Sequence, residues 1–335
     1  MNKVFCFGEL LLHFSPQLQG KWINDARMPV YVGGAELNVA TALALWEIPV
    51  KYGSAAPENY LTKEIIHHLG KKNIDTSSII LGGSRLGTYY LPQGADLKNA
   101  GVIYDRAFSS FSELQPGQLD WDSIFSDVKW FHFSAINPAL NKNVAMVCKE
   151  ALLAAEKKNI FISVDLNYRE KLWQYGHDPK DVMPELVQHC NLVMGNIWAA
   201  EKMLGIAIDP KMKDNRNDYV VQAEKTSADI IKHFPNCKHV ANTFRFNQDE
   251  GILYYATLYH NDKLFIADEK KTSKIVDRVG SGDCFMAGLI YSMLHSFAPQ
   301  QTIDFAVQAA FNKLFITGDT TTSSVDEIKN FSHDE

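Results

Sequence analysis

The sequence of 335 residues is poor in cysteine and has no paired cysteine spacing. Its five cysteines are an odd number and are scattered along the chain: Cys6, Cys148, Cys190, Cys237 and Cys284. This pattern argues against a disulfide framework and a zinc site, and it suits a cytoplasmic, reducing environment. No apolar run reaches the roughly 18 residues that a membrane span needs. The N-terminal residues predict a first strand, not a signal peptide.

A large charge of one sign is also lacking. Lys and Arg number 33 against 39 Asp and Glu, which gives a net charge of −6. Nucleic acid and anionic membranes are therefore poor candidate partners. An anionic substrate would have to be held by local arginines or backbone amides. Hydrophobic residues make up 46% of the chain and charged residues 21%, which is ordinary globular composition, and the length suits one large domain or two unequal ones.

Apolar runs of strand length alternate with helical patterns along most of the chain. Strands are predicted at residues 4–7, 130–134, 160–165, 191–194 and 239–243, and helices at 36–46, 142–157, 199–204, 283–296 and 302–315. This order predicts an α/β fold with a mainly parallel sheet covered by helices on both faces. Residues 10–32 and 87–106 break the rhythm with short alternating segments and no convincing helix. They predict antiparallel strands outside the main sheet, which would form a small lid.

The strongest motif is Asp277–Gly288, which reads DRVGSGDCFMAG. It follows a strand-like segment at residues 274–276 and opens a predicted helix. The small residues at 280–282 let a ligand approach the backbone, and the helix directs free N–H groups and its positive dipole end at that loop. The pattern therefore predicts a phosphate site, although an ordinary helix cap with Asp283 in its first turn fits the same residues. It is neither a Walker A loop nor a GxGxxG fingerprint.

A second motif is Gly33–Ala40, which reads GGAELNVA. The glycine pair closes the predicted lid segment and a helix begins. Asn38 places one polar group on a very apolar helix. Ligand binding explains these residues, and so does a tight turn followed by a buried core asparagine.

Together the motifs are much more specific. A GG-x-x-x-N-x-A followed about 240 residues later by D-x-x-G-x-G-D-x-F-x-x-G resembles the two signatures of the ribokinase-like sugar kinases, the phosphofructokinase B family. The βα pattern and the lid segments match as well, so the resemblance covers nearly the whole chain. It implies a single ribokinase-like domain over residues 1–335, a three-layer α/β/α sandwich with a small β-sheet lid. It also implies ATP and Mg²⁺ as cofactors and a homodimer formed through the lid.

The resemblance also implies roles for individual residues. Asp283 would be the catalytic base, and Gly280, Ser281 and Gly282 would form an anion hole. The nucleotide would be bound by Asn196, Thr243, Arg245, Gly280, Gly282 and Asn312. The site would lie at the carboxyl edge of the parallel strands, where open α/β sheets bind their ligands.

Further segments resemble the 2-keto-3-deoxygluconate kinase branch: Gly8-Glu9, Ser15-Pro16, Tyr104-Asp105-Arg106, Asp165–Arg169, Leu172-Trp173, Thr243–Arg245 and Gly318-Asp319. In that branch the sugar-acid site would be lined by Gly34, Asn38, Tyr89, Tyr104, Arg106 and Arg169. A planar guanidinium can hold a carboxylate through two hydrogen bonds, which suits such a substrate. Taken alone, Arg169 is explained by an ordinary ion pair and the tyrosines by packing within the lid.

Three positions depart from the family pattern. Arg278 replaces a common Thr, Ser281 stands where Ala or Gly is commoner, and Ala199 occupies the Glu position of an N-x-x-E motif that helps to organise magnesium. Either another carboxylate supports the metal, or the activity is weak, or the enzyme has diverged. The metal ligands are therefore left unassigned. Alternatives are a kinase for a neutral sugar such as fructose, ribose or tagatose, and a catalytically weak, ligand-binding relative. The glycine spacing disfavours a dinucleotide-dependent oxidoreductase.

Overall fold

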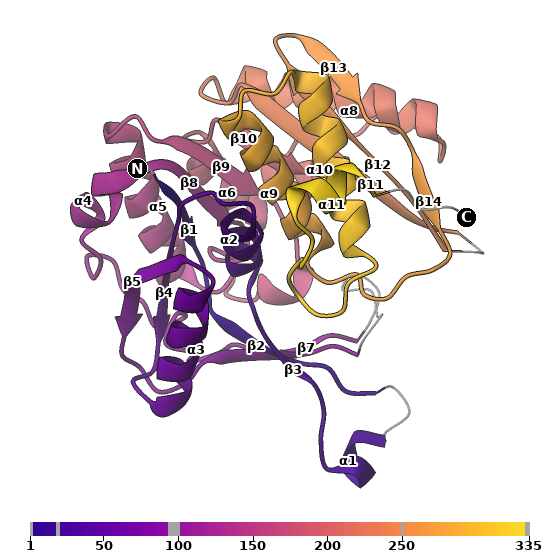
Figure 1. The fold of residues 1–335 in the computed structure, drawn as a ribbon. Helices are drawn as coiled ribbons and strands as arrows, with labels where there is room; N and C mark the ends of the chain where they lie inside the picture. The colour runs from indigo at the N-terminus through magenta and orange to yellow at the C-terminus, as the bar shows by residue number, and fades with distance from the viewer. Residues whose placement is uncertain (1–2, 18–20, 93–100, 249–250, 332–335) are drawn as a thin grey trace.

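The computed structural model describes residues 3–17, 21–92, 101–248 and 251–331, and its strands form one large and one small sheet (Figure 1). The strand order of the large sheet is β13-β12-β11-β10-β9-β8-β1-β4-β5, with β14 paired to β12. Seven strands are parallel: β1 (Lys3–Phe7), β4 (Val50–Ala56), β5 (Ile74–Leu81), β8 (Val128–Ser134), β9 (Phe161–Asp165), β10 (Leu192–Gly195) and β11 (His239–Gln248). The edge beyond them is antiparallel: β12 (Gly251–His260), β13 (Lys263–Ile266) and β14 (Lys270–Thr272).

Helices cover both faces of this sheet and make three layers. One face packs against α2 (Ala35–Leu45), α3 (Tyr60–Lys71), α9 (Ser281–Leu294), α10 (Pro299–Lys313) and α11 (Val325–Lys329). The other packs against α4 (Trp121–Ile124), α5 (Lys142–Lys157), α6 (Pro179–Val187), α7 (Ile197–Leu204) and α8 (Arg216–His233). Two single-turn 3₁₀ helices lie at Phe125–Asp127 and Glu170–Leu172.

Strand β1 shows how the sequence produces these layers. Val4 and Cys6 point into the first core, while Phe5 and Phe7 point into the second. A strand buried on both faces must be apolar throughout, because successive side chains point in opposite directions. The predicted α/β fold, with its largely parallel sheet and flanking helices, is confirmed.

The small sheet is the predicted lid, with strand order β3-β2-β6-β7. Its strands are β2 (Leu11–Phe14), β3 (Val30–Gly33), β6 (Gly87–Tyr90) and β7 (Ile103–Asp105). The expectation of purely antiparallel pairing is wrong at its centre, where β2 and β6 run parallel. The reason is that β2 follows β1 and β6 follows β5, so both leave parallel strands in the same direction. A five-residue helix, α1 (Lys21–Asp25), also interrupts the segment, because one turn is too short to leave a helical periodicity in the sequence.

The strand predicted just before the glycine motif is also wrong. Residues 274–276 are not in a strand, and the nearest strand, β14, ends at Thr272. The amides of Val276 and Asp277 donate to the carbonyl oxygen of Leu314 at 2.9 and 3.1 Å instead. The motif is therefore fastened to the residue after α10, not to a sheet neighbour.

None of the helices in the described part of the chain combines the length and apolar character that crossing a membrane requires. All five cysteines are buried and unbridged.

Candidate active site

A cavity of about 620 Å³ lies between the lid and the carboxyl ends of the parallel strands. Asp165 enters it from the end of β9, Tyr89 from lid strand β6, and residues 278–283 from the loop that begins α9. Every predicted site residue except Asn312 contributes to its lining. Asn312 is buried on α10. The chain thus brings the two separate motifs together in one cleft.

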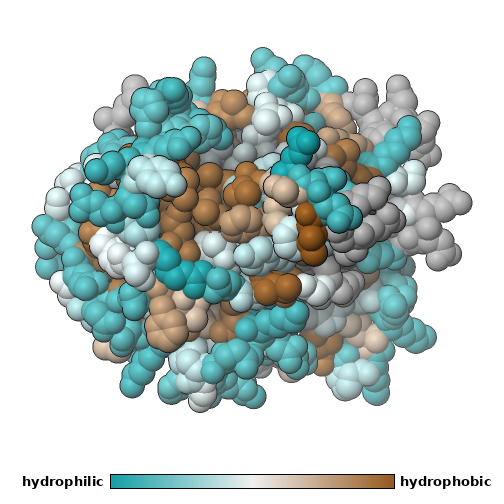
Figure 2. Space-filling view, turned by 90° about the horizontal axis from the view of Figure 1, so that it is seen from below, coloured by the Kyte–Doolittle hydropathy of each residue, from teal (hydrophilic) through white to brown (hydrophobic). Residues whose placement is uncertain are grey.

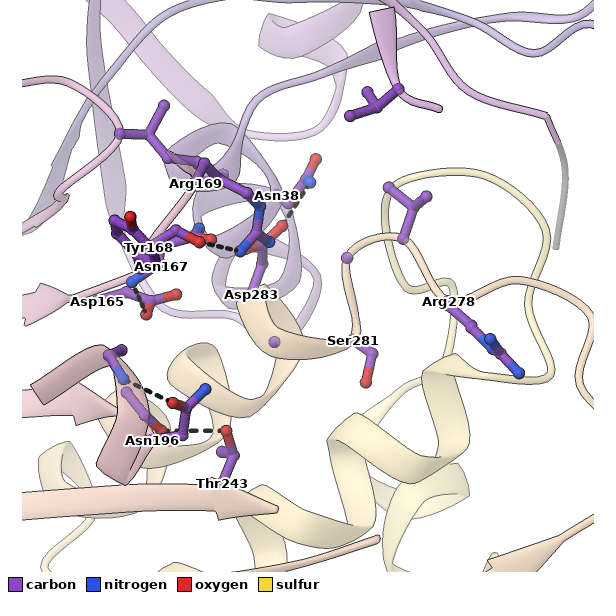
Figure 3. A pocket seen from close by; sticks show the side chains of 18 of the residues that line it. Asn38, Asp165, Asn167, Tyr168, Arg169, Asn196, Thr243, Arg278, Ser281 and Asp283 are labelled. Atoms are coloured by element: carbon purple, nitrogen blue, oxygen red, sulfur yellow. Dashed lines mark hydrogen bonds between the residues drawn. The ribbon is translucent and has the colours of Figure 1, made fainter. Parts of the chain in front are cut away.

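The glycine loop presents backbone to this cleft. Gly280 precedes α9 in the left-handed conformation, with φ of 75°, and a Cβ there would lie 1.9 Å from the carbonyl oxygen of Asp319. A Cβ on Gly282 would meet no atom within 4 Å. The Ser281 hydroxyl donates to the carbonyl oxygen of Ala310 at 3.1 Å and points away from Asp283 (Figure 3). Ser281 can therefore offer its amide, but its side chain belongs to the buried side of the loop.

Asp283 is partly buried in the first turn of α9. Its Oδ2 accepts a hydrogen bond from Nδ2 of Asn38 at 2.7 Å, and Arg169 points toward this pair (Figure 3). Burial raises the pKa of Asp283 to about 8. The Asn38 hydrogen bond lowers this pKa, the Asp165 and Glu36 charges raise it, and the Arg169 charge lowers it. A carboxylate with a pKa near working pH is suited to accept a proton from a substrate.

Asn38 has a second polar atom that faces no protein partner. Its Oδ1 is buried and, within the described residues, accepts no hydrogen bond. Because Asn38 lines the cavity beside Asp283, this oxygen is placed to accept a hydrogen bond from a substrate hydroxyl.

The lid end of the cavity carries the two predicted arginines. Arg106 is buried, and its Nε donates to Oε2 of the equally buried Glu9 at 2.5 Å. The Ser109 hydroxyl donates to the other oxygen of Glu9. Arg169 donates from Nη1 to the carbonyl oxygen of Tyr168 at 3.0 Å and faces the cleft. Glu9 thus fixes one edge of Arg106 and offsets its charge, a role that the sequence pattern did not reveal.

The two predicted tyrosines differ in how they meet the cleft. Tyr89 uses its hydroxyl elsewhere, donating to Oδ2 of Asp319 at 2.7 Å, and its ring stacks on His13 with centroids 4.4 Å apart. Tyr104 is half-buried, and its ring lies 6.5 Å from that of Tyr89. The Tyr89 hydroxyl is therefore engaged by Asp319, in the chain that follows α10.

The opposite end of the cavity is formed by strand and helix ends. Asn196 caps α7, its Oδ1 accepting from the amide of Ala199 at 2.8 Å, and Thr243 donates to the carbonyl oxygen of Gly195 at 3.1 Å (Figure 3). Arg245 also lines this end. The N-terminus of α7 and the glycine loop at residues 280–282 thus both border this cavity. Such an arrangement suits an anionic, phosphate-bearing ligand.

Comparisons with known proteins decide the family. The model of the pfkB family carbohydrate kinases matches residues 1–324. The chain belongs to this family. It is an ATP-dependent carbohydrate kinase.

The similarity to individual relatives extends over nearly the whole chain. A crystal structure of 2-dehydro-3-deoxygluconokinase from Thermotoga maritima is 33% identical and has a TM-score of 0.88, with 98% of each chain covered. A 2-dehydro-3-deoxygalactonokinase of Haloferax volcanii is 25% identical over 96% of this chain and 94% of its own. An E. coli structure described as a ribokinase II, in complex with ATP and Mg²⁺, has a TM-score of 0.77 over 98% of each chain, but at 19% identity it shows the fold alone.

The predicted site left out several residues that line the cavity of this kinase, among them Trp198, Lys202 and Tyr254. The Tyr254 hydroxyl is buried and has no hydrogen-bond partner within the described residues. Tyr254 lies opposite Arg245 in the antiparallel pairing of β11 with β12. No motif marks it, because β12 reaches the cavity only through its antiparallel pairing with β11, which depends on the fold.

Proposed function

We propose that this kinase phosphorylates 2-keto-3-deoxygluconate at its terminal hydroxyl, using ATP and Mg²⁺. The observation that carries this proposal is the placement of Arg106 and Arg169 in the same cavity as Asp283. A keto-deoxy sugar acid has a carboxylate at one end and a primary hydroxyl at the other. Guanidinium groups suit the carboxylate, and the hydroxyl can then reach Asp283. The names of the Thermotoga and Haloferax relatives, both kinases for 2-keto-3-deoxy sugar acids, support the same class of substrate.

In the proposed reaction, Asp283 takes the proton of the primary hydroxyl as that oxygen attacks the γ-phosphorus of ATP, the bond from this phosphorus to the β–γ bridging oxygen breaks, and ADP leaves. The Asn38 amide, 2.7 Å from Asp283, holds the carboxylate in position. The backbone amides of residues 280–282 stabilise the negative charge of the transferred phosphoryl group. The nucleotide would extend toward Asn196, Thr243 and Arg245.

Ala199 stands where the family pattern has the Glu that helps to organise magnesium, so another carboxylate in this cleft would have to support the ion. Asp165 is nearly buried, lines the cavity and carries oxygen ligands of the hard type that Mg²⁺ prefers. Mg²⁺ commonly uses one or two carboxylates together with waters and substrate phosphates, so no protein cage is required. The residues present therefore fit the ion, and Asp165 would hold it. When bound, Mg²⁺ neutralises charge on the phosphate oxygens.

A neutral-sugar kinase is the second candidate, and the Glu9–Arg106 pair favours it. Because Glu9 already offsets the charge of Arg106, one arginine, Arg169, is left to decide between an acid and a neutral sugar. Arg169→Ala is therefore the sharpest test. We expect kcat/KM for the keto-deoxy acid to fall about 10–100-fold, the loss of one charged hydrogen-bonded contact, and kcat/KM for fructose or ribose to change little.

Arg85→Ala is the matched control, because this half-buried arginine, which precedes β6, pairs with Asp105 and does not line the cavity. The 2-keto-3-deoxygluconate and 2-keto-3-deoxygalactonate acids, fructose and ribose should be compared in wild type and both variants by ADP release. A wild-type preference for a neutral sugar, or an equal loss on every substrate in Arg169→Ala, would establish the second candidate instead. Sugar binding without ADP release would indicate a ligand-binding relative.

We further propose a cytosolic homodimer formed through the lid. Ile103 of β7, Val30 of β3, and Trp22 and Ile23 of α1 leave large apolar side chains exposed on the lid. The side that carries the lid faces the viewer in Figure 2, where apolar residues gather near the middle. Such a face is ordinarily covered by a partner, here a second copy. Light scattering at micromolar concentration should give a dimeric mass, and Ile103→Glu should lower it. A monomeric wild type would refute the dimer.

A further inference from the structure

Lys313 is a fully buried lysine that the reaction described above does not use. It is the last residue of α10, and its exposed fraction is 0%. Lysine is almost never fully buried unless other groups compensate its charge, because removing an ammonium group from water is costly. Its place in the fold therefore calls for a physical reason.

The lysine side chain lies directly behind the anion-hole loop. A Cβ added to Gly280 would be 3.5 Å from Cε of Lys313, so the end of the lysine side chain packs against the first glycine of the loop. The Lys313 Nζ donates to the carbonyl oxygen of Ile316 at 2.9 Å. The side chain of Lys313 thus contacts both segments: its ammonium binds the chain that follows α10, and its Cε packs next to Gly280.

Two loops close around this ammonium. Val276 and Asp277 donate their amides to the carbonyl oxygen of Leu314. The Asp277 carboxylate in turn accepts from the amides of Val279 and Gly318, each at 3.1 Å. Residues 276–280 and 314–318 are therefore fastened to each other, with Lys313 at their junction.

The charges around Lys313 are negative. Burial lowers the pKa of Lys313, and the carboxylates of Asp277, Asp319 and Asp283 act in the opposite direction. Asp283 is on the cleft side of the loop, while Asp277 and Asp319 are buried. The ammonium is therefore influenced by three carboxylates, and its side chain packs against the loop that would receive a phosphoryl group.

We propose that Lys313 is a positioning residue that supplies the fixed internal cation of the anion hole. It holds the glycine loop against the chain that follows α10, and its charge offsets the negative charge that accumulates on the transferred phosphoryl group. Because a side chain supplies this cation, turnover does not require a dissolved monovalent ion. The inference rests on the phosphoryl transfer of the proposed function and is independent of which sugar accepts the group.

Two variants separate charge from structure. Lys313→Met keeps the apolar part of the side chain and removes the ammonium. Lys313→Gln also removes the charge but retains a donor for the Ile316 carbonyl. We expect kcat to fall in both by about 10²–10³-fold, the size of effect seen when one stabilising group of an oxyanion hole is lost. The KM for the sugar should stay within about threefold, because Lys313 does not line the cavity. Lys71→Met, an exposed lysine in the last turn of α3, is the matched control and should behave as wild type.

The response to ions provides a readout that a merely structural role would not move. Ammonium chloride, compared with tetramethylammonium chloride at equal ionic strength, should restore part of the kcat of Lys313→Met, because NH₄⁺ matches the group that was removed. The wild type should not respond to NH₄⁺ or K⁺. Folding of each variant is checked by circular dichroism, so that a loss of kcat is measured on folded protein.

Three outcomes would overturn the proposal. One is a wild-type kcat in folded Lys313→Gln. Another is a loss of activity that only follows the unfolded fraction. The third is a wild type whose turnover depends on added K⁺ or NH₄⁺, a measurement that stands even where neither variant folds. The assays use whichever acid or neutral sugar the wild type phosphorylates fastest. A wrong sugar then appears as a changed substrate preference, and a wrong role for Lys313 as an unchanged kcat.

Discussion

The two sides of the loop at residues 277–283 differ in how well their polar groups are satisfied. On the buried side, Asp319 accepts from His13 at 2.7 Å and from the Tyr89 hydroxyl at 2.7 Å. On the cleft side, Asn38 has an oxygen without a partner in the described residues, and the pKa of Asp283 is raised to about 8. The satisfied side fixes the loop, and the unsatisfied side is left to bind and react. Folded proteins tolerate such unsatisfied groups where the surrounding structure is rigid enough to hold them.

The protonation of His13 follows from its partners on the buried side. Its Nε2 lies 2.9 Å from the carbonyl oxygen of Leu91, which can only accept, so Nε2 must carry a proton. Its Nδ1 faces the Asp319 carboxylate, which favours a second proton. Burial lowers the pKa of His13, but Asp319, the Leu91 carbonyl and the charge of Asp277 outweigh it, and the net pKa is raised. A buried ion pair thus ties lid strand β2 to the chain behind the glycine loop.

The largest expected effect is on the cleft side. Asp283→Asn keeps the shape of the side chain but removes the proton acceptor, so kcat should fall by about 10²–10⁴-fold, the contribution of a positioned general base. ATP affinity, measured by calorimetry, should change little. Asp326→Asn, in the exposed first turn of α11, is the matched control and should leave kcat unchanged. Near wild-type turnover in Asp283→Asn would remove Asp283 from the chemistry.

The next effect is on the buried side. Asp319→Asn leaves the His13 cation without its counter-charge, and breaking a buried pair in this way costs about 3–5 kcal/mol of unfolding free energy. Urea denaturation monitored by tryptophan fluorescence measures it. Tyr89→Phe removes one hydrogen bond to the same carboxylate and should cost only about 0.5–1.5 kcal/mol. Equal stability of Asp319→Asn and wild type would mean that the pair does not hold the lid.

A third prediction concerns how activity and stability depend on pH through Asp283, on the cleft side. Because Asp283 must lose its proton to act as a base, kcat/KM should rise with pH through a midpoint near pH 8 and level off about one pH unit higher. Stability should respond in the opposite sense. The folded pKa of Asp283 lies above the unfolded value of about 4, so its contribution is complete below pH 4 and is lost as pH rises through 8.

Asp283→Asn removes that dependence. Its Tm, relative to wild type, should therefore increase from pH 5 to pH 8. Each pKa unit that separates the folded from the unfolded state is worth about 1.4 kcal/mol of unfolding free energy, so the Tm difference should reach several degrees at pH 8. Thermal unfolding of both proteins across this range is the measurement. A Tm difference that shrinks with pH would show that Asp283 is ionised more readily in the folded state than its surroundings indicate.

Sequence patterns were most informative where local signals agree. Helix α5 begins and ends at the predicted residues, 142 and 157, because Asn141 caps it and a regular apolar face follows. Both glycine motifs lie on the cleft because each joins a strand or loop to a helix at the same edge of the sheet. Strand β11 is longer than predicted, ending at residue 248, because pairing with β12 extends it beyond the parallel part.

What the sequence could not predict depends on contacts between distant residues. The parallel pairing of β2 with β6 follows from where each leaves the large sheet. Glu9 and Lys313 gain their positions from partners far along the chain; the Gly8-Glu9 segment carries part of the resemblance but does not reveal the pairing with Arg106, and Lys313 is an ordinary helix-end lysine in the sequence. The direction of the Ser281 side chain is likewise set by α10.

Ser281 gives the smallest expected effect and the finest test of the comparison. Although it lies between two glycines of the proposed anion hole, its hydroxyl donates to Ala310 on the buried side. Ser281→Ala should therefore cost about 0.5–1.5 kcal/mol of unfolding free energy through the lost hydrogen bond, and kcat should change less than about threefold. Gly282→Ala is the contrasting variant, because its methyl group would enter the open cleft and should raise the KM for ATP. A loss of kcat above tenfold in Ser281→Ala, at unchanged stability, would mean that the hydroxyl acts on the cleft side, and the division between a fixing side and a reacting side would then not hold at this residue.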